Sequence, residues 1–170
     1  GDAQKLIKRI EQLSLKLQVI LLTHGHLDHV GAAPKLKSHF GVEIWGPHRA
    51  DEYWFQALPQ QSRQFGLFEV DSFVPDRWLN EDKQRLNIAG YQFEVLHLPG
   101  HTPGHIGFIE HTQKVMFTGD VLFKQSIGRT DFPGGNHEEL LASIRTKLYT
   151  LPDDMIVIAG HGPHTTIGQE

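Results

Sequence analysis

Three imidazoles and a carboxylate stand within six residues of this chain, in the stretch 23–31. The stretch reads Thr-His-Gly-His-Leu-Asp-His-Val-Gly, and its candidate donors are His24, His26, Asp28 and His29. Imidazole nitrogens and carboxylate oxygens are the donors that divalent transition metals take from proteins. A single histidine is most often an ordinary core or surface residue, but this spacing predicts a metal site.

Three more candidate donors follow at wide intervals, each beside a glycine. They are His101 in Pro-Gly-His-Thr-Pro-Gly-His, Asp120 in Thr-Gly-Asp, and His161 in Gly-His-Gly-Pro. Small flanking residues let the backbone turn sharply, so side chains from several strand ends can converge on one point. Seven donors are enough for two divalent metal ions, which could share a hydroxide that attacks a carbonyl carbon. The pattern therefore predicts metal-dependent hydrolysis.

Two other histidines are predicted to support the ligands rather than to bind metal. His97 alternates with Val95 and Phe93 along a predicted strand, and His105 begins a strand just after the turn that holds His101. Either ring could orient a ligand through a hydrogen bond. The alternative is packing in the core for His97, and packing or a backbone hydrogen bond for His105.

The composition excludes several classes of protein. The chain has 170 residues, 16 Lys and Arg against 20 Asp and Glu, a net charge of -4 and no cysteine. Without cysteine there are no disulfides or thiolate ligands, and without a basic surplus nucleic acid is a poor partner. No apolar run is long enough to cross a bilayer, and no signal-peptide pattern opens the chain. We expect one domain over 1–170, cytoplasmic, with a small-molecule substrate and no membrane partner.

The elements that must position the donors alternate between strand and helix in the first half of the chain. Residues 15–23 are apolar and β-branched without a polar face, which is typical of a strand buried on both sides. The first metal motif follows this strand directly. The other elements predicted here are a helix over 3–13 with Asp2 as its N-cap, a helix ending at Gly41, a strand at 42–45, and a helix opened by Pro47 and ended by Pro59.

Hairpins and a last helix and strand are predicted for the second half. Residues 60–80 lack periodicity and are predicted to form a long loop, which either borders the substrate cleft or crosses the surface over a small satellite core. Asn136 followed by Glu139 resembles a capping box and predicts a helix start. The predicted strands are 86–88, 91–98, 106–110, 114–118 and 155–159. Together these elements predict one layered α/β domain.

Taken together, the motifs resemble those of the metallo-β-lactamase fold superfamily, and they occur in that family's order along the whole chain. The resemblance implies an αββα sandwich of two mixed sheets, with metals between the inner sheet edges. It implies two divalent ions, zinc first, with iron or manganese acceptable to the same donors. The implied ligands are His24, His26 and His101 for one metal, Asp28, His29 and His161 for the other, and Asp120 as the bridge.

Within the superfamily the chain resembles the short, single-domain type of glyoxalase II, or hydroxyacylglutathione hydrolase. The resemblance is carried by Gly-Asp-Val-Leu-Phe at 119–123 and Ser-Ile-Gly-Arg-Thr-Asp-Phe-Pro-Gly-Gly at 126–135. It implies thioester hydrolysis, S-lactoylglutathione to lactate and glutathione, by a metal-bridging hydroxide. Asp28 and Asp120 are the implied catalytic residues. Asp28 would orient or deprotonate the attacking water.

Other interpretations of these motifs remain open at this point. Residues 128–132 also resemble the iron-dependent persulfide dioxygenases of the same superfamily, and a non-catalytic metal-binding module is a third possibility. Lys124 and Arg129 are candidates for binding a substrate carboxylate, or Arg129 is held by a structural partner such as Asp131. Family members usually begin with additional strands, so we expect a domain trimmed at its N-terminus.

Overall fold

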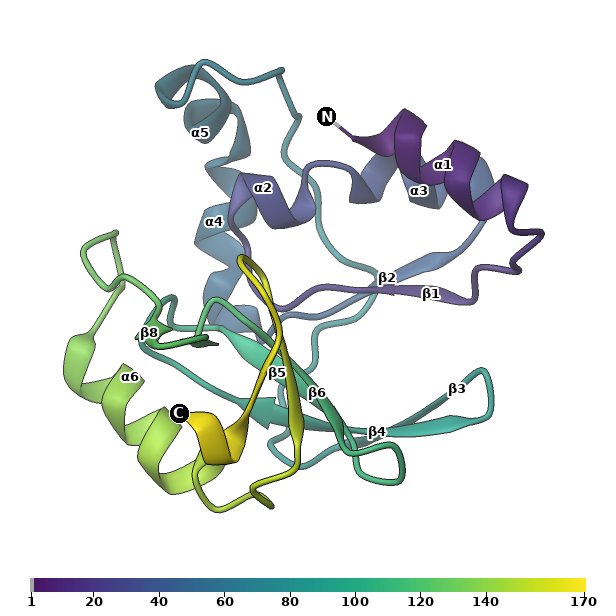
Figure 1. The fold of residues 1–170 in the computed structure, drawn as a ribbon. Coiled ribbons are helices and arrows are strands. Elements are labelled where there is room, and N and C mark those ends of the chain that lie inside the picture. Colours follow the sequence, from purple (N-terminus) through teal and green to yellow (C-terminus); the bar gives the residue numbers. More distant parts are fainter. Residues whose placement is uncertain (1) are drawn as a thin grey trace.

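The computed structural model describes residues 2–170 and stacks them in the order helices, small sheet, large sheet, helix (Figure 1). Helices α1 and α3 cover the small sheet, and α6 covers the outer face of the large one. The helices are α1 (Ala3–Gln12), α2 (Leu27–Val30), α3 (Ala33–Phe40), α4 (Glu52–Gln56), α5 (Leu58–Gln64) and α6 (His137–Ser143). This order of layers confirms the predicted αββα fold class.

The two main sheets differ in size. The small sheet is the parallel pair β1 (Val19–Leu21) and β2 (Glu43–Trp45). The large sheet has the order β10-β9-β6-β5-β4-β3 and is mixed, because β6 and β9 run parallel while the other neighbours are antiparallel. Its strands are β3 (Arg85–Ile88), β4 (Tyr91–His97), β5 (Ile106–Glu110), β6 (Val115–Gly119), β9 (Ile156–Ala159) and β10 (Thr165–Thr166).

Alternation along the strands of the large sheet builds a core on each of its faces. Val95 and Phe108 belong to the cluster that faces the small sheet, whereas their neighbours Leu96 and Ile109 belong to the cluster around α6. Successive side chains of a strand point to opposite faces, so a strand between two layers must be apolar on both. Helix α6 continues into a π-helical turn, Ile144–Leu148, and adds Leu140 to the outer core.

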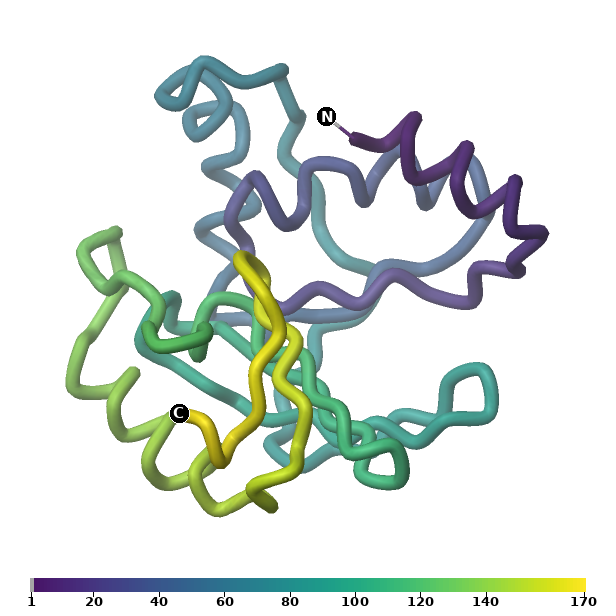
Figure 2. Tube along the Cα trace, in the orientation of Figure 1, coloured from purple at the N-terminus to yellow at the C-terminus, as the bar shows by residue number. Residues whose placement is uncertain are grey.

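The strand directions bring the predicted donors to one edge of the large sheet. Strands β4, β6 and β9 point the same way, since β4 and β6 are both antiparallel to β5 and β9 is parallel to β6. Their carboxyl ends therefore lie along the same side of the sheet, which is the shared edge at the strand ends. The segment after β9 rises from this edge toward α2, as the yellow part of the chain shows in Figure 2.

The predicted helix opened by Pro47 and ended by Pro59 is wrong, and so is the loop predicted from residue 60. The structure has a 3-10 turn at Arg49–Asp51, then α4, then α5 from Leu58 to Gln64. Pro59 lies in the first turn of α5, where its missing N–H would have had no helical partner in any case. Residues 65–84, all of which the structure describes, form no helix or strand beyond a single bridge between Trp45 and Arg77.

The remaining predicted elements are confirmed, with differences at their ends. The strand predicted over 15–23 forms only at Val19–Leu21, and a short hairpin of β7 (Leu122–Phe123) and β8 (Ser126–Ile127) was not predicted. The side chain of Asn136 caps α6 by accepting from the N–H of Glu139 at 3.2 Å, as the capping box predicted. Asp2 precedes α1 but does not cap it, because its carboxylate pairs with Lys5.

No helix within residues 2–170 has the length and apolar composition needed to span a membrane.

Replacing Gly100 with alanine is expected to cost about 3 kcal/mol or more of unfolding free energy. A Cβ atom at Gly100 would lie 2.3 Å from the backbone nitrogen of Leu140 in α6, at a φ of +133°. Gly90→Ala is the matched control, because Gly90 has a φ of +86° but a Cβ there would meet nothing within 4 Å. We expect about 1 kcal/mol for this control, from backbone strain alone. Urea unfolding measures both, and equal losses would contradict a clash with α6.

Candidate metal centre

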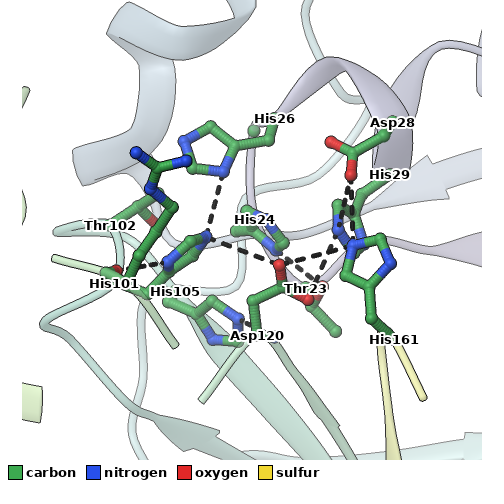
Figure 3. Close-up of polar contacts among 12 residues, drawn as sticks. Thr23, His24, His26, Asp28, His29, His101, Thr102, His105, Asp120 and His161 are labelled. Carbon is green, nitrogen blue, oxygen red and sulfur yellow. Dashed lines mark hydrogen bonds and ion pairs between the residues drawn. The ribbon is translucent and has the colours of Figure 1, made fainter. Parts of the chain in front are cut away.

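The seven side chains predicted as metal ligands meet at the shared edge of the sheets (Figure 3). Within each of three overlapping groups, the ligand atoms lie within 4.8 Å of one another. The groups are His24 with His26 and His101, His24 with His29 and Asp120, and Asp28 with His29 and His161. The structure therefore brings together all seven residues, and the overlap of the groups makes them one cluster.

Asp120 lies between the two ends of this cluster. Its Oδ2 atom is 3.7 Å from Nε2 of His101 and 3.6 Å from Nε2 of His161, and its Oδ1 is 3.4 Å from Nε2 of His29. At one end, Nδ1 of His26 and Nε2 of His101 are 3.0 Å apart. A carboxylate in this central position can reach both ends of the cluster, as a bridging ligand must.

Several buried donors of the cluster have no hydrogen-bond partner, and this is what a metal site requires. Within residues 2–170, these unpartnered atoms are Nε2 of His24, His26 and His29 and Oδ1 of Asp120. A buried polar atom without a partner costs about 1 to 3 kcal/mol, so such atoms are rarely gathered in one place without a ligand. The donor set of imidazoles and carboxylates fits divalent metal ions.

Burial keeps two of the histidines in the form that binds metal. Burial and the neighbouring imidazoles hold the pKa of His24 well below 6.5, and burial lowers the pKa of His26 to about 3. Both rings are therefore neutral at pH 7, with a lone pair available. The close approach of the His29 ring holds the pKa of Asp28 below its usual range, so Asp28 is ionised.

The pKa of His29 is raised rather than lowered, and we therefore expect a proton to be released when metal binds. Burial lowers its pKa, but the carboxylates of Asp120 and Asp28, each with an oxygen 3.4 Å from Nε2 of His29, outweigh burial and raise the pKa to about 9. Protonated His29 thus stabilises the metal-free fold below its ordinary pKa of 6.5, and this contribution is lost as pH rises through about 9. At pH values below about 9 a metal must displace this proton from the folded protein, and at higher pH it need not.

This release can be measured by titration calorimetry of the metal-free protein with zinc in buffers of different ionisation enthalpy. We expect close to one proton from this residue per loaded protein at pH 7.5 and progressively less toward pH 9.5. Buffer-independent heats at pH 7.5 would contradict the charged state of His29.

His105 packs against the cluster and makes a backbone hydrogen bond to it. Its ring is fully buried and stacks on His24 with 4.7 Å between centroids. Its Nε2 accepts a hydrogen bond from the backbone N–H of Asp120 at 3.1 Å, which places the ring proton on Nδ1. His105 therefore holds the backbone of the central carboxylate while packing against a histidine of the cluster.

His97 lies one step further from the cluster. Its Nε2 is 2.9 Å from the carbonyl oxygen of Pro103, and its ring stacks on His48 with 4.5 Å between centroids. It makes no hydrogen bond to any of the seven donors in the described part of the chain. His97 holds the loop that carries His101 rather than the His101 ring, whose Nδ1 is 2.7 Å from the carbonyl oxygen of Arg129.

The sequence analysis missed one buried carboxylate, that of Asp51. Asp51 is fully buried, and burial raises its pKa to about 6 against three hydrogen bonds that lower it. Those bonds come from the segments that carry His24, His26 and His101. No spacing in the sequence marks Asp51, because its partners are two backbone N–H groups and a hydroxyl that lie far from it in the chain.

A pocket of about 660 Å³ opens over the cluster. Aromatic and apolar side chains form most of its wall, and residues of the predicted loop border it as expected. The pocket-lining residues other than the predicted donors include Tyr53, Trp54, Gln60, Gln61, Gln64, Phe65, Leu67, Phe123, Ile127, Arg129 and Phe132. Next to His26, the rings of Trp54 and Phe132 lie 4.4 and 5.4 Å from the imidazole, so this part of the wall is aromatic.

The two cations predicted to bind a substrate carboxylate are placed differently. Arg129 lines the pocket, but its guanidinium donates two hydrogen bonds of 2.6 Å to Asp131 and lies 4.0 Å over the ring of Phe132. Lys124 is exposed in the turn between β7 and β8 and is not among the pocket residues. Arg129 thus has the structural partner that the sequence analysis left open.

Comparison with known proteins agrees with this site. The profile described as "Metallo-beta-lactamase superfamily" matches residues 1–161. A Haemophilus influenzae protein named hydroxyacylglutathione hydrolase GloC is 64% identical over 170 residues, which are 100% of this chain and 80% of that protein. Among solved structures, BLEG-1 B3 metallo-beta-lactamase has a TM-score of 0.91 at 43% identity, over 99% of this chain and 81% of that one. TTHA1623, solved in a di-iron-bound form, has a TM-score of 0.90 at 37% identity, over 99% of this chain and 82% of that one.

Proposed function

The chain belongs to the metallo-beta-lactamase superfamily, and from this premise we propose that it is a metal-dependent hydrolase of small thioesters. The observation that carries the proposal is the convergence of seven imidazole and carboxylate donors beneath one pocket. The 64% identity to the hydroxyacylglutathione hydrolase of Haemophilus influenzae supports S-lactoylglutathione as the substrate, with lactate and glutathione as products. Residues 1–170 would act as one hydrolase domain.

The proposed ligands divide between two metal positions that share Asp120. When bound, the two ions would polarise the thioester carbonyl and lower the pKa of water to near neutrality. We propose zinc, which favours nitrogen and oxygen donors with an open coordination position, while iron suits the same donors. The ligands would be His24, His26 and His101 at the first position and Asp28, His29 and His161 at the second, with Asp120 contributing to both.

Asp28 is the group of this chain proposed to act on the attacking water. Its carboxylate is half exposed, lines the pocket, and lies 3.2 Å from Nε2 of His161 through Oδ2. Since Asp28 is ionised, it can accept a hydrogen bond from water and orient a lone pair toward the carbonyl carbon.

As the water oxygen bonds to the carbonyl carbon, the carboxylate of Asp28 accepts a proton from that water and the carbonyl π electrons move onto oxygen. Return of these electrons forms the carbonyl group again and breaks the carbon–sulfur bond. The electron pair of that bond leaves with sulfur as a thiolate. A thiol has a pKa of about 8.5, so the thiolate is a stable leaving group. The reaction therefore needs no general acid at the sulfur.

The aromatic wall beside His26 supplies the contact surface for the acyl group and the thioester sulfur of the substrate. Trp54 and Phe132 form this wall, with 6.2 Å between their ring centroids. Apolar contact with these rings, next to His26, would exclude water from the reacting bond. It would also hold the substrate without a charged side chain.

Metal analysis combined with activity on the purified protein tests the proposal. About two zinc ions per chain and turnover of S-lactoylglutathione would support it. One iron per chain with oxygen uptake on glutathione persulfide would instead identify the dioxygenase. A protein with two bound metals and no thioester turnover would contradict thioester hydrolysis.

A further inference from the structure

We infer that Asp51 is a positioning residue that sets the distance between the two chain segments holding the first metal, without touching that metal or any ligand side chain. The inference rests on the proposed function only in assuming that His24, His26 and His101 bind a metal. It concerns a carboxylate that hydrolysis itself does not use.

The contacts of Asp51 join two segments that are far apart in the sequence. Its Oδ2 accepts a hydrogen bond from the N–H of Gly25 at 2.9 Å and another from the hydroxyl of Thr102 at 2.8 Å. Its Oδ1 accepts from the N–H of Gly104 at 2.6 Å. One carboxylate therefore binds both segments at once.

The positions of these partners matter because they are neighbours of the ligands. Gly25 stands between His24 and His26, and Thr102 directly follows His101. The ligand atoms of His26 and His101 come within 3.0 Å of each other. Any change in the separation of the two segments at Asp51 therefore changes the separation of these ligand atoms.

The close approach of both segments to Asp51 is built into the local sequence. A Cβ at Gly104 would lie 2.5 Å from the backbone nitrogen of Asp51 and 2.7 Å from its Oδ1. A Cβ at Gly25 would lie 2.6 Å from Cβ of Trp54, in the helix that follows Asp51. Only glycine lets both segments reach the carboxylate at hydrogen-bond distance.

Asp51 itself is held from a third part of the chain. It ends the 3-10 turn Arg49–Asp51, whose preceding residue, His48, donates its N–H to the carbonyl oxygen of Gly104 at 3.1 Å. Nearby, Oε1 of Gln61 accepts from the N–H of Leu27 at 2.9 Å and its Nε2 donates to the carbonyl oxygen of Trp54 at 2.9 Å. Helices α4 and α5 thus form a rigid support behind the metal motif.

A carboxylate is the side chain that this environment requires. Two of the three partners are backbone N–H groups, which can only donate, and both oxygens of Asp51 accept from them. Asp51 has no ion pair within residues 2–170, so its burial has no compensating cation in the protein itself. An asparagine would turn its NH₂ group toward one of the N–H donors and leave that donor unpaired.

Cobalt binding to the metal-free protein separates a positioning role from a purely structural one. Cobalt(II) affinity is measured by competition with a chelator, and the ligand geometry by the visible absorption bands of the bound ion. We expect Asp51→Asn to weaken the first cobalt by about 10- to 100-fold and to shift its bands, because loss of a supporting hydrogen bond has that effect on metal sites. Thr102→Val removes one of the three bonds and should weaken cobalt in the same direction by a smaller factor.

Asp76→Asn is the matched control. Asp76 also accepts a backbone N–H with its carboxylate, from Ile44 at 2.8 Å, and pairs with Lys37, but it lies away from the cluster. This variant should lose stability and keep the cobalt affinity and spectrum of the unsubstituted chain. An equal loss of cobalt affinity in Asp76→Asn would show a general effect of stability and overturn the inference.

An unchanged cobalt affinity and spectrum in folded Asp51→Asn would also overturn it. If Asp51→Asn does not fold, Thr102→Val decides, because an unchanged affinity and spectrum in that variant contradict a positioning role. The measurement needs no thioester. Failure of the unsubstituted protein to hydrolyse thioesters while binding cobalt would therefore count against the proposed function and leave the role of Asp51 supported by its own result.

Discussion

Replacing Asp120 with alanine is expected to lower kcat by about 10³-fold or more, the scale found when a group acting directly on the transition state is removed. Asp120 is the only one of the seven donors with ligand atoms close to both His101 and His161. Without it, the buried imidazoles would hold two dications with one fewer negative charge between them. Metal content should fall from about two ions per chain to one or fewer.

Atomic emission on dialysed protein gives the metal content, and initial rates with S-lactoylglutathione give kcat. Asp120→Asn keeps the shape of the side chain and loses its charge, so it should lose nearly as much activity as alanine. Asp154→Asn is the control, because Asp154 is an exposed carboxylate that pairs with Lys114. Full occupancy by two metals in Asp120→Ala would contradict a bridging role.

Removing the metals is expected to lower the thermal unfolding midpoint by roughly 8 to 16 °C. A ligand present at 1,000 times its Kd stabilises the folded state by about 4 kcal/mol, and a chain of this size shifts by about 2 to 4 °C per kcal/mol. The metal-free cluster is also intrinsically unfavourable, because the ring of His24 packs within 4.9 Å of three other predicted ligands and its Nε2 has no partner.

The metal-free protein should also be less stable at pH 5.5 than at pH 7.5. The folded pKa values of His24 and His26 lie below the unfolded value of 6.5, so the unfolded state binds more protons below that pH. Their contribution to stability is therefore lost as pH falls below about 6.5. Calorimetric scans with and without chelator at pH 7.5 and 5.5 measure both effects. Equal midpoints with and without chelator at pH 7.5 would contradict a metal that stabilises the fold.

Element types were predictable where the pattern is local. The capping box at Asn136, the left-handed stop at Gly41 and the hairpin before His97 all formed where their residues indicated. The prediction failed at Pro59, because a proline is equally compatible with the end of one helix and the first turn of the next. Leu58 is fully buried, and packing of α5 on the helices beside it places Pro59 in the first turn of a new helix.

The features of the site can also be separated into those that the local sequence indicates and those that packing decides. Residue types and spacing were enough to establish the chemical type of the donors and the grouping of His24, His26, Asp28 and His29, since residues so close in the chain must share one loop whatever the fold. They also indicated that His101, Asp120 and His161 sit at sharp turns, because glycines flank them.

Which atoms meet was settled by tertiary packing alone. His26 and His101 are 75 positions apart, and their contact depends on the parallel directions of strands that no local pattern specifies. The aromatic wall beside His26 and the buried bonds of Asp51 are of the same kind. The motif at 23–31 indicates the metal chemistry, while packing between distant segments sets the geometry of the site. The reason is that a hydrogen bond or a ring contact depends on position in space rather than on spacing along the chain.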